Sequence, residues 1–597
     1  MQLVRTNQYL SGQPSCTRCG LAWQRRAALP RCRQKGADML KTILAASVLA
    51  MPALAADTVI LNARIHTMDA KDRIAEGLCI ENGRITRVGS TAQARACITP
   101  GTRVIDAQGR LVLPGLIDSH MHALSGSLAD TGIDFAAADT PEKLAAALQA
   151  LKAASPGTGP IQARGWQNHL FGPKGPTAAE LDAAFGDRIV LIESVDGHST
   201  WYSTAALKAG GITAATQDPV PGSSFWERDA AGNPTGTARE GADADMARRL
   251  FAPTTAAYAA AFRRWLPRAL ESGLTGLFDA GMGAPDEASA YQLLAGMEAA
   301  GELPLRYFSS TANRSEADDP VARLLQLKAR HGGRLLRPTA VKLFADGVPE
   351  GHTAYLLAAY KDKASFKGVP MMTDAHLDAR ITAAEKAGVP VHVHAIGGAA
   401  VRQVLDAVAR ARFAGLTGQR HAIAHMDLVD AADVPRFAKL NVVAQTSIQW
   451  ATRDPSYDNI GRFVGTDVME AAYPFKSLLA SGAVQSFGTD WPAAAYLSTW
   501  KPLTQIEVAV TRRLPGRRDL PARNPQQALT VAQAVRALTF GSAYQLGVER
   551  ELGSLEVGKR ADLVMLDRDI FTVDPFTIAA GRSLLTMVDG RVVWQAP

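Results

Sequence analysis

The sequence predicts an α/β protein: a (β/α)8 TIM-like barrel, a small β-sandwich domain built from both ends of the chain, and an insert over the barrel mouth. Both ends of the chain show strand-like patterns. The middle alternates short apolar runs with alanine-rich helical stretches, the order expected of a parallel barrel. Residues 124–265 separate the first two candidate barrel strands by far more chain than one crossover needs.

The two ends of the chain have the same sequence pattern. Apolar runs with turn signals fill residues 57–113, and the pair Asn82-Gly83 is typical of a hairpin turn. Residues 561–594 repeat this pattern, with Asp589-Gly590 as the turn. We therefore predict one composite sandwich from residues 56–113 and 551–597.

The barrel is predicted within residues 114–550, with residues 124–265 as an inserted subdomain. Its first strand leads into His120. The later strands are predicted at Leu274–Asp279, Leu305–Ser309, Ala340–Phe344, Val389–His394, Ala422–His425, Val442–Gln445 and Val484–Phe487. Helices are predicted over residues 373–387, 398–413 and 467–481, where alanine-rich stretches follow strands.

The net charge of +7 is concentrated at the N-terminus. Residues 1–55 contain eight basic residues and one acid, so 56 residues of each sign remain in residues 56–597. A formally neutral chain offers no general attraction to phosphate, which argues against a nucleic-acid partner. No run past residue 60 approaches eighteen apolar residues, which excludes a polytopic membrane protein.

The N-terminal region resembles an export signal. Met39 opens a short basic segment, Ile43–Met51 is apolar, and small residues precede Ala56. We predict a signal peptide at residues 39–55, too short to be a stable membrane anchor, and therefore a periplasmic protein. A buried N-terminal helix is the alternative. Residues 1–38 are predicted to be an upstream extension that is not part of the mature protein.

The five cysteines fall into two groups. Cys16, Cys19 and Cys32 form only a weak zinc pattern, because no fourth ligand stands at a usual spacing. Cys79 and Cys97 remain in the mature chain, and the sequence leaves open whether they form a disulfide or stay as separate buried thiols.

The candidate chemistry begins at His120 and His122. Side chains two apart on a strand share a face, so both imidazoles point to one place, as a zinc-type cation requires. Core or loop histidines are the alternative interpretation. The later predicted strands strengthen the metal interpretation, because their carboxyl ends meet at one rim of a barrel. The further candidate ligands at these ends are Lys342, Asp346, His392, His394, His425 and Asp490.

Together these motifs resemble the amidohydrolase superfamily of metal-dependent hydrolases. The run Pro114-Gly-Leu-Ile-Asp-Ser-His-Met-His and the late Ala561-Asp-Leu-Val carry the general resemblance. The family 3 branch, which includes N-substituted formamide deformylases, is indicated by Val195-Asp-Gly-His-Ser-Thr-Trp, Gly236-Thr-Ala-Arg-Glu, Val341-Lys-Leu-Phe-Ala-Asp-Gly, His394-Ala-Ile-Gly and Gly488-Thr-Asp-Trp-Pro. The resemblance covers essentially residues 57–597.

The resemblance implies a metal centre with one or two divalent ions, zinc being the expected metal. His120, His122 and Asp490 would bind the more buried ion. His394 and His425 would bind the second.

Lys342 stands where relatives have a carboxylated lysine that bridges two metals. An ammonium cannot ligate a cation, so the binuclear interpretation requires this modification, and an unmodified Lys342 implies a mononuclear centre. Two features depart from the family pattern: Gly398 stands where relatives usually have Asp, and His392 shares a strand face with His394 and could compete as a ligand.

The predicted function is hydrolysis of an amide or N-formyl-like C–N bond by a metal-activated hydroxide. Asp490 would take the proton and return it to the leaving nitrogen. His198 would contact the substrate carbonyl or line the pocket, with a surface role as the alternative. Lining or packing roles stay open for Trp166, Gln449 and Trp491.

Two other functions remain open at this stage. The same site could cleave an ester, a lactone or a carbamate, or the chain could be an inactive metal-bearing binding protein. The expected partner is a small-molecule substrate. Relatives are often dimers, so a homodimer is consistent with the resemblance.

Overall fold

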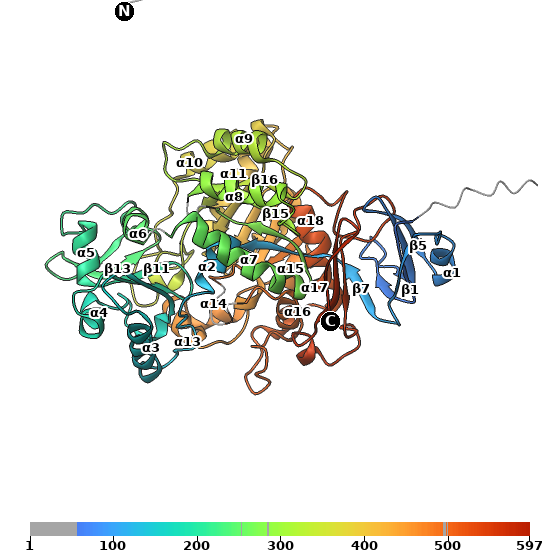
Figure 1. The fold of residues 1–597 in the computed structure, drawn as a ribbon. Helices are drawn as coiled ribbons and strands as arrows, with labels where there is room; N and C mark the ends of the chain where they lie inside the picture. The colour runs from blue at the N-terminus through green and yellow to red at the C-terminus, as the bar shows by residue number, and fades with distance from the viewer. Residues whose placement is uncertain (1–55, 252, 283–285, 494–496, 498) are drawn as a thin grey trace, which may run out of the picture. The chain divides into compact units, whose positions relative to one another are not determined.

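The computed structural model describes residues 56–597, apart from residues 252, 283–285, 494–496 and 498 (Figure 1). The predicted signal peptide, the upstream extension and the three N-terminal cysteines lie outside the described residues. In the described part of the chain, no helix is long and apolar enough to cross a membrane.

The predicted barrel is confirmed as an eight-stranded parallel sheet with neighbours in the order β20-β19-β18-β17-β16-β15-β14-β8. The ends of this sheet meet, because the Asp490 N–H, just after β20, donates to the His120 carbonyl of β8 at 2.7 Å. The strands are β8 (Leu116–Met121), β14 (Leu274–Asp279), β15 (Arg306–Ala312), β16 (Leu336–Phe344), β17 (Val391–Ala395), β18 (Ala422–His425), β19 (Val443–Ser447) and β20 (Gln485–Gly488).

Helices cover the outside of the barrel. The predicted helices at residues 373–387 and 398–413 are confirmed as α10 (Asp374–Ala387) and α11 (Gly398–Phe413). The Thr373 hydroxyl accepts the His376 N–H to cap α10, and Gly388 ends this helix in the left-handed region.

The prediction of a single helix over residues 467–481 is wrong. This segment forms two short helices, α14 (Thr466–Ala471) and α15 (Phe475–Ala480). Pro474 precedes the first residue of α15. Proline disfavours helical backbone in the residue before it and has no N–H to donate, so one continuous helix cannot pass through this position.

The composite sandwich is built from both ends of the chain as predicted. One sheet has the order β5-β4-β1-β6, and the other has the order β23-β22-β21-β7-β2-β3. The first sheet contains β1 (Thr58–Leu61), β4 (Gly77–Glu81), β5 (Arg84–Gly89) and β6 (Arg103–Asp106). The second contains β2 (Arg64–His66), β3 (Ile74–Ala75), β7 (Leu111–Pro114), β21 (Leu563–Leu566), β22 (Ser583–Val588) and β23 (Arg591–Gln595).

The two ends of the chain pair directly within the second sheet, where β21 runs antiparallel to β7 with Val564 opposite Leu113. The predicted turns are confirmed, because Asn82-Gly83 and Asp589-Gly590 all have positive φ. Cys79 and Cys97 form a disulfide, which answers the question that the sequence left open.

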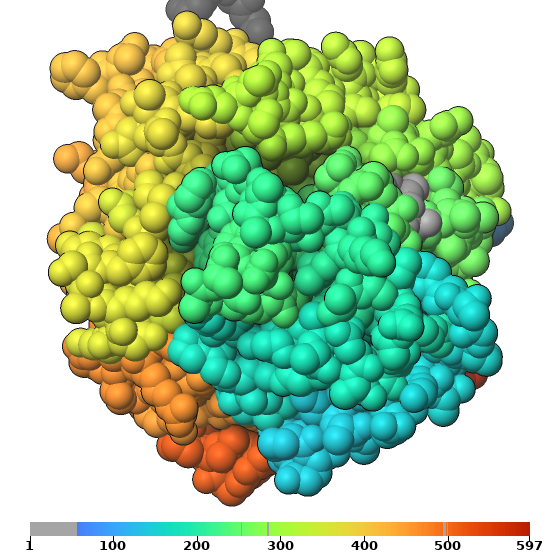
Figure 2. All heavy atoms as spheres, turned by 90° about the vertical axis from the view of Figure 1, so that its left-hand side faces the viewer, coloured from blue at the N-terminus to red at the C-terminus, as the bar shows by residue number. Residues whose placement is uncertain are grey.

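The insert between β8 and β14 has a sheet of its own, with the order β12-β13-β11-β10-β9. In Figure 2 its residues, drawn in cyan to green, fill the centre of the face shown. Its strands are β9 (Ile161–Trp166), β10 (Val190–Ser194), β11 (Ser199–Tyr202), β12 (Trp226–Arg228) and β13 (Pro234–Arg239). The following helix α7 (Thr255–Glu271) packs on the barrel, since Phe262 and Trp265 share a core with Leu274 and Leu277 of β14.

A buried ion-pair network joins the barrel to the sandwich. Arg306 at the start of β15 is 1% exposed and donates to both oxygens of Asp562 at 2.6 and 2.9 Å and to Asp589 at 2.5 Å. Removing one partner of a buried ion pair leaves the other charge buried without compensation.

We expect Arg306→Met to lower the free energy of unfolding by about 3–5 kcal/mol, because Asp562 then loses its cation. The measurement is urea denaturation followed by circular dichroism. Arg263→Met is the matched control, since the Arg263–Glu302 pair is about half exposed and should change stability by about 1 kcal/mol or less. Equal losses in the two variants would show that the network does not stabilise the junction.

Candidate metal centre

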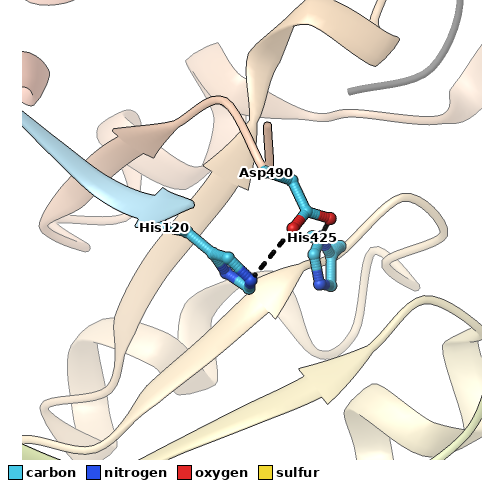
Figure 3. Close-up of side chains that lie close together, drawn as sticks. All are labelled: His120, His425 and Asp490. Atoms are coloured by element: carbon cyan, nitrogen blue, oxygen red, sulfur yellow. Dashed lines mark ion pairs between the residues drawn. The ribbon is translucent and has the colours of Figure 1, made fainter. Parts of the chain in front are cut away.

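Three predicted ligands meet at the carboxyl ends of the barrel strands. His120 lies near the end of β8, His425 is the last residue of β18, and Asp490 follows β20 (Figure 3). The Asp490 Oδ1 atom lies 3.3 Å from His120 Nε2, and Oδ2 lies 3.8 Å from His425 Nδ1. One ligand atom from each residue lies within 4.8 Å of the other two, a spacing that a single metal ion can bridge.

His122 and Lys342 reach the same place. His122 Nε2 lies 3.1 Å from Asp490 Oδ1, and Lys342 Nζ lies 3.3 Å from His120 Nε2. Asp490 Oδ1 is buried and makes no hydrogen bond, although two imidazole nitrogens lie close to it. A buried carboxylate oxygen without a hydrogen bond is a suitable ligand for a bound cation. The donor set therefore suits a divalent metal.

His394 lies beside this group, and His392 lies behind it. The ring centroids of His394 and His425 are 4.5 Å apart. His392 Nε2 instead lies 2.9 Å from Nδ1 of His120, the nitrogen on the far side of the ring from Asp490. This geometry favours His394 over His392 as the second-site ligand, in line with the sequence-based preference.

Burial keeps the histidines in their ligand form. It lowers the pKa of His120, His392, His394 and His425 well below the usual value, and positively charged neighbours including Lys342 add to the effect. Neutral imidazole is the form that binds metal. Burial also lowers the pKa of Lys342 to about 8, against the opposing charge of Asp490, so a larger fraction of this amine is neutral than in an exposed lysine.

Asp118 ties the ends of β8 and β20 together. Its carboxylate accepts hydrogen bonds from the Thr489 N–H at 3.1 Å, the Thr489 hydroxyl at 2.7 Å and the His120 N–H at 3.0 Å. Asp490 and His425 both have positive φ, at 58° and 71°, a region that non-glycine residues rarely adopt. The carboxylate of Asp118 therefore fixes the backbone from which His120 and Asp490 project.

Further polar and aromatic contacts orient the histidine rings. Gln445 Oε1 lies 3.0 Å from His120 Nδ1, and the Ser447 hydroxyl lies 3.0 Å from His425 Nδ1. Trp450 stacks on the His425 ring with centroids 5.1 Å apart. The sequence pattern predicted no role for these residues. The first two lie on the predicted seventh strand and its continuation, where a polar residue facing the site was a usable signal.

The departure at Gly398 has a structural explanation. A Cβ atom there would lie 3.0 Å from the Leu428 carbonyl, so the position is closely packed. Asp346 is the carboxylate near His394, with Oδ1 3.9 Å from its Nε2. Asp346 accepts N–H groups from Tyr355, Ile396 and Gly397, and burial raises its pKa to about 8.

The insert contributes His198 to the same region. Its ring centroid lies 5.1 Å from that of His394, and its Nδ1 lies 2.6 Å from Glu240 Oε2. Burial opposes protonation of His198, but the charge and hydrogen bond of Glu240 outweigh it and raise the pKa to about 9. Glu240 also accepts the Thr353 hydroxyl at 2.5 Å, which links the insert to the loop after β16.

The two candidate tryptophans, Trp166 and Trp491, pack against neighbouring residues. Trp166 is fully buried in the core of the insert, and its indole N–H donates to the Ile192 carbonyl. Trp491 stacks on Trp265. These contacts favour packing, one of the two roles that the sequence left open for both tryptophans.

Gln449 and the Trp491 backbone support the loops that carry the candidate ligands. The Gln449 amide donates to the carbonyls of Thr489 and Thr499. The Trp491 carbonyl accepts the His122 N–H at 2.8 Å. Both interactions therefore position residues next to the centre.

Comparisons with known proteins agree with this geometry. A family model described as "Amidohydrolase family" matches residues 103–594. The chain is 30% identical to "Protein LONG AFTER FAR-RED 3" of Arabidopsis thaliana, over 91% of this chain and 92% of that protein. It is 27% identical to "N-substituted formamide deformylase" of Arthrobacter pascens, over 89% and 97%. A crystal structure of an uncharacterized metal-dependent hydrolase from Pyrococcus furiosus superposes with a TM-score of 0.64 at 25% identity, covering 86% of this chain and all of that one.

Proposed function

The chain belongs to the amidohydrolase family, and we propose that it cleaves a non-peptide amide of the N-formyl type at the centre around Asp490. Membership of this family indicates a metal-dependent hydrolase of carbon–nitrogen bonds, without specifying the substrate. One observation supports the proposal above all: the imidazoles of His120 and His122 lie 3.3 and 3.1 Å from the buried Oδ1 of Asp490, which makes no hydrogen bond, and His425 Nδ1 lies 3.8 Å from Oδ2. The formamide deformylase among the relatives supports the choice of bond.

Six residues of the chain would hold the metal. His120, His122 and Asp490 form one group, and His394 and His425 form the other, with Lys342 as the carboxylated bridge between two ions. A divalent ion held there, zinc being expected, would acidify water and polarise the substrate carbonyl. The lowered pKa of Lys342 supports the carboxylation, since only a neutral amine reacts with carbon dioxide.

The side chains of this protein supply the proton transfers. Asp490 would accept the proton of the attacking water and deliver it to the leaving nitrogen, which needs a carboxylate beside the reacting atoms. His198 would donate an N–H from Nε2 to the carbonyl oxygen, because its Nδ1 is already engaged by Glu240. The buried Asp118 would hold Asp490 in place through Thr489.

Esters, lactones and carbamates remain the alternative substrates, because they form a similar tetrahedral intermediate. A panel of matched formamides, amides, esters, lactones and carbamates separates these cases. The intact donor set argues against an inactive binding protein, since each expected position has a usable residue. The homodimer stays a prediction.

We expect Asp490→Asn to lower kcat on the best substrate of that panel by about 10²–10⁴-fold, because an amide cannot accept the proton. Much of the metal should remain, as the amide oxygen can still act as a ligand. The measurements are steady-state kinetics and metal analysis. Asp458→Asn, an exposed position on α13 (Tyr457–Val464), is the control and should match the wild type. Unchanged turnover in Asp490→Asn would remove this residue from the proposed proton path.

We expect metal analysis by mass spectrometry to find about two divalent ions per chain in the wild type and at most about one in Lys342→Ala, because the bridging ligand is lost. His376→Ala, on the outer helix α10, is the control. A wild type with one ion, and a Lys342→Ala variant with the same content, would contradict the carboxylated bridge and support a mononuclear centre.

We also propose that the protein is exported, through the signal peptide predicted at residues 39–55. The Cys79–Cys97 disulfide supports this, since disulfides persist mainly in oxidising compartments. We expect the intact mass of the protein recovered from the periplasm of a bacterial host to correspond to a chain that starts at Ala56. An uncleaved chain that stays in the cytoplasm would contradict export.

A further inference from the structure

A small cavity lies next to the proposed metal centre. Trp450, whose ring stacks on His425, forms part of its wall, together with Ile396 and Asp427, each two residues beyond a proposed ligand. Its free space is about 50 Å³, room for only a few water molecules or one compact polar group. Other parts of the wall are apolar, including Val348, Leu428, Ile460 and Met469.

Four acidic residues and one cationic residue line this cavity. The acids are Asp196, Glu350, Asp427 and Asp454, and the cation is Arg523. Asp196 is satisfied by local donors, among them the Asn168 amide and the His198 N–H. Glu350 lies on the 3-10 turn η2 (Pro349–Gly351). Within the described residues, its carboxyl group accepts its own backbone N–H and makes no ion pair.

Two further carboxylate groups are only partly satisfied. Asp427 accepts the Tyr473 hydroxyl on Oδ2 at 2.6 Å, whereas its Oδ1 is buried without a hydrogen-bond partner. Asp454 accepts the Ser456 hydroxyl and N–H on Oδ1 only. The cavity therefore retains more acceptor capacity than its own walls use.

Arg523 balances only part of this charge, since it lowers the pKa of Asp427 and Asp454 against the larger effect of burial. It is 4% exposed, donates from Nη1 to the Trp450 carbonyl at 3.0 Å, and lies over the rings of Tyr473 and Tyr457 at 4.6 and 4.9 Å. No carboxylate of the described chain is within ion-pair distance of it. Its charge offsets at most one acid. Burial together with the charge of Asp196 raises the pKa of Glu350 to about 8, so this carboxyl group ionises more readily when a further cation lies beside it.

These acids do not form a second metal site. Within the described residues, the only group of three or more ligand atoms close enough for one ion is His120, His425 and Asp490. The cavity carboxylates are spread around a wider space, which fits a polyatomic cation with several N–H donors better than a bare metal ion.

We propose, building on the function proposed above, that this cavity binds the ammonium group of a substrate whose scissile C–N bond lies at the metal centre. Glu350 is the principal acceptor of that ammonium group, and Asp427 and Asp454 supply further oxygens. The cavity holds the ammonium group alone, and an aliphatic chain connects that group to the scissile bond. The substrate class is therefore a singly acylated aliphatic diamine or a related aminoalkyl amide.

The first test compares matched formamides of increasing chain length that end in an ammonium, a methyl or a carboxylate group. At the best length, the metal-loaded wild type should prefer the ammonium substrate to its methyl analogue by at least about tenfold in kcat/KM, since charged hydrogen bonds are among the strong ones. Glu350→Gln should reduce this preference at least about tenfold. Glu316→Gln, an exposed acid outside the cavity, should leave both rates unchanged.

The second test measures binding without turnover, by titration calorimetry of the metal-loaded protein with n-pentylamine and n-pentanol. The ammonium ion should bind at least about tenfold more tightly than the alcohol, and Glu350→Gln should abolish the difference. Asp454→Asn is the second variant. If Glu350→Gln does not fold, this variant should reduce the difference in affinity between the ammonium ion and the alcohol.

The two tests distinguish failure of the ammonium site from failure of the proposed reaction. Cleavage of neutral formamides without any preference for ammonium, in calorimetry as in kinetics, overturns the cation site and leaves the proposed reaction intact. Cleavage of no formamide, with ammonium binding that depends on Glu350, overturns the reaction and supports the cation site.

Discussion

The structure depends on one electrostatic constraint: a carboxylate oxygen of Asp490 lies buried at the end of a barrel with no hydrogen-bond donor bound to it. A bare buried anion of this kind is costly unless a cation compensates it. Among the nearby groups, burial keeps the imidazoles of His120 and His425 neutral and lowers the pKa of Lys342. The protein alone supplies too little positive charge here, and this deficit is what makes the site suitable for divalent metal.

The surroundings of the centre follow from the same constraint. Asp118 and Trp491 hold the backbone of the ligand loops by hydrogen bonds, while Trp450 and Gln445 fix imidazole rings. Residues that position ligands are therefore spread over several strands and loops. The insert adds a cationic imidazole, His198, which Glu240 holds beside His394.

Much of the fold was predictable because barrel strands are short, apolar and regularly alternated with helices. The candidate ligands were predictable as well, since polar residues at the ends of such strands share one rim. What escaped prediction depends on contacts between distant segments. The stacking of Trp450 on His425 and the cavity around Glu350 arise from loop conformations that no local pattern encodes. The break before Pro474 was readable locally, because proline restricts the preceding residue, but the alanine-rich pattern on both sides concealed it.

The pairing of β7 with β21 has a consequence for biogenesis. The N-terminal strands leave the ribosome long before residue 563 is made, so the second sheet of the sandwich cannot be completed until nearly the whole polypeptide has been synthesised. Contacts of such large sequence separation form late and slowly. An edge strand waiting for its neighbour is prone to wrong pairing, so newly made chains should depend on chaperones until the final strands arrive.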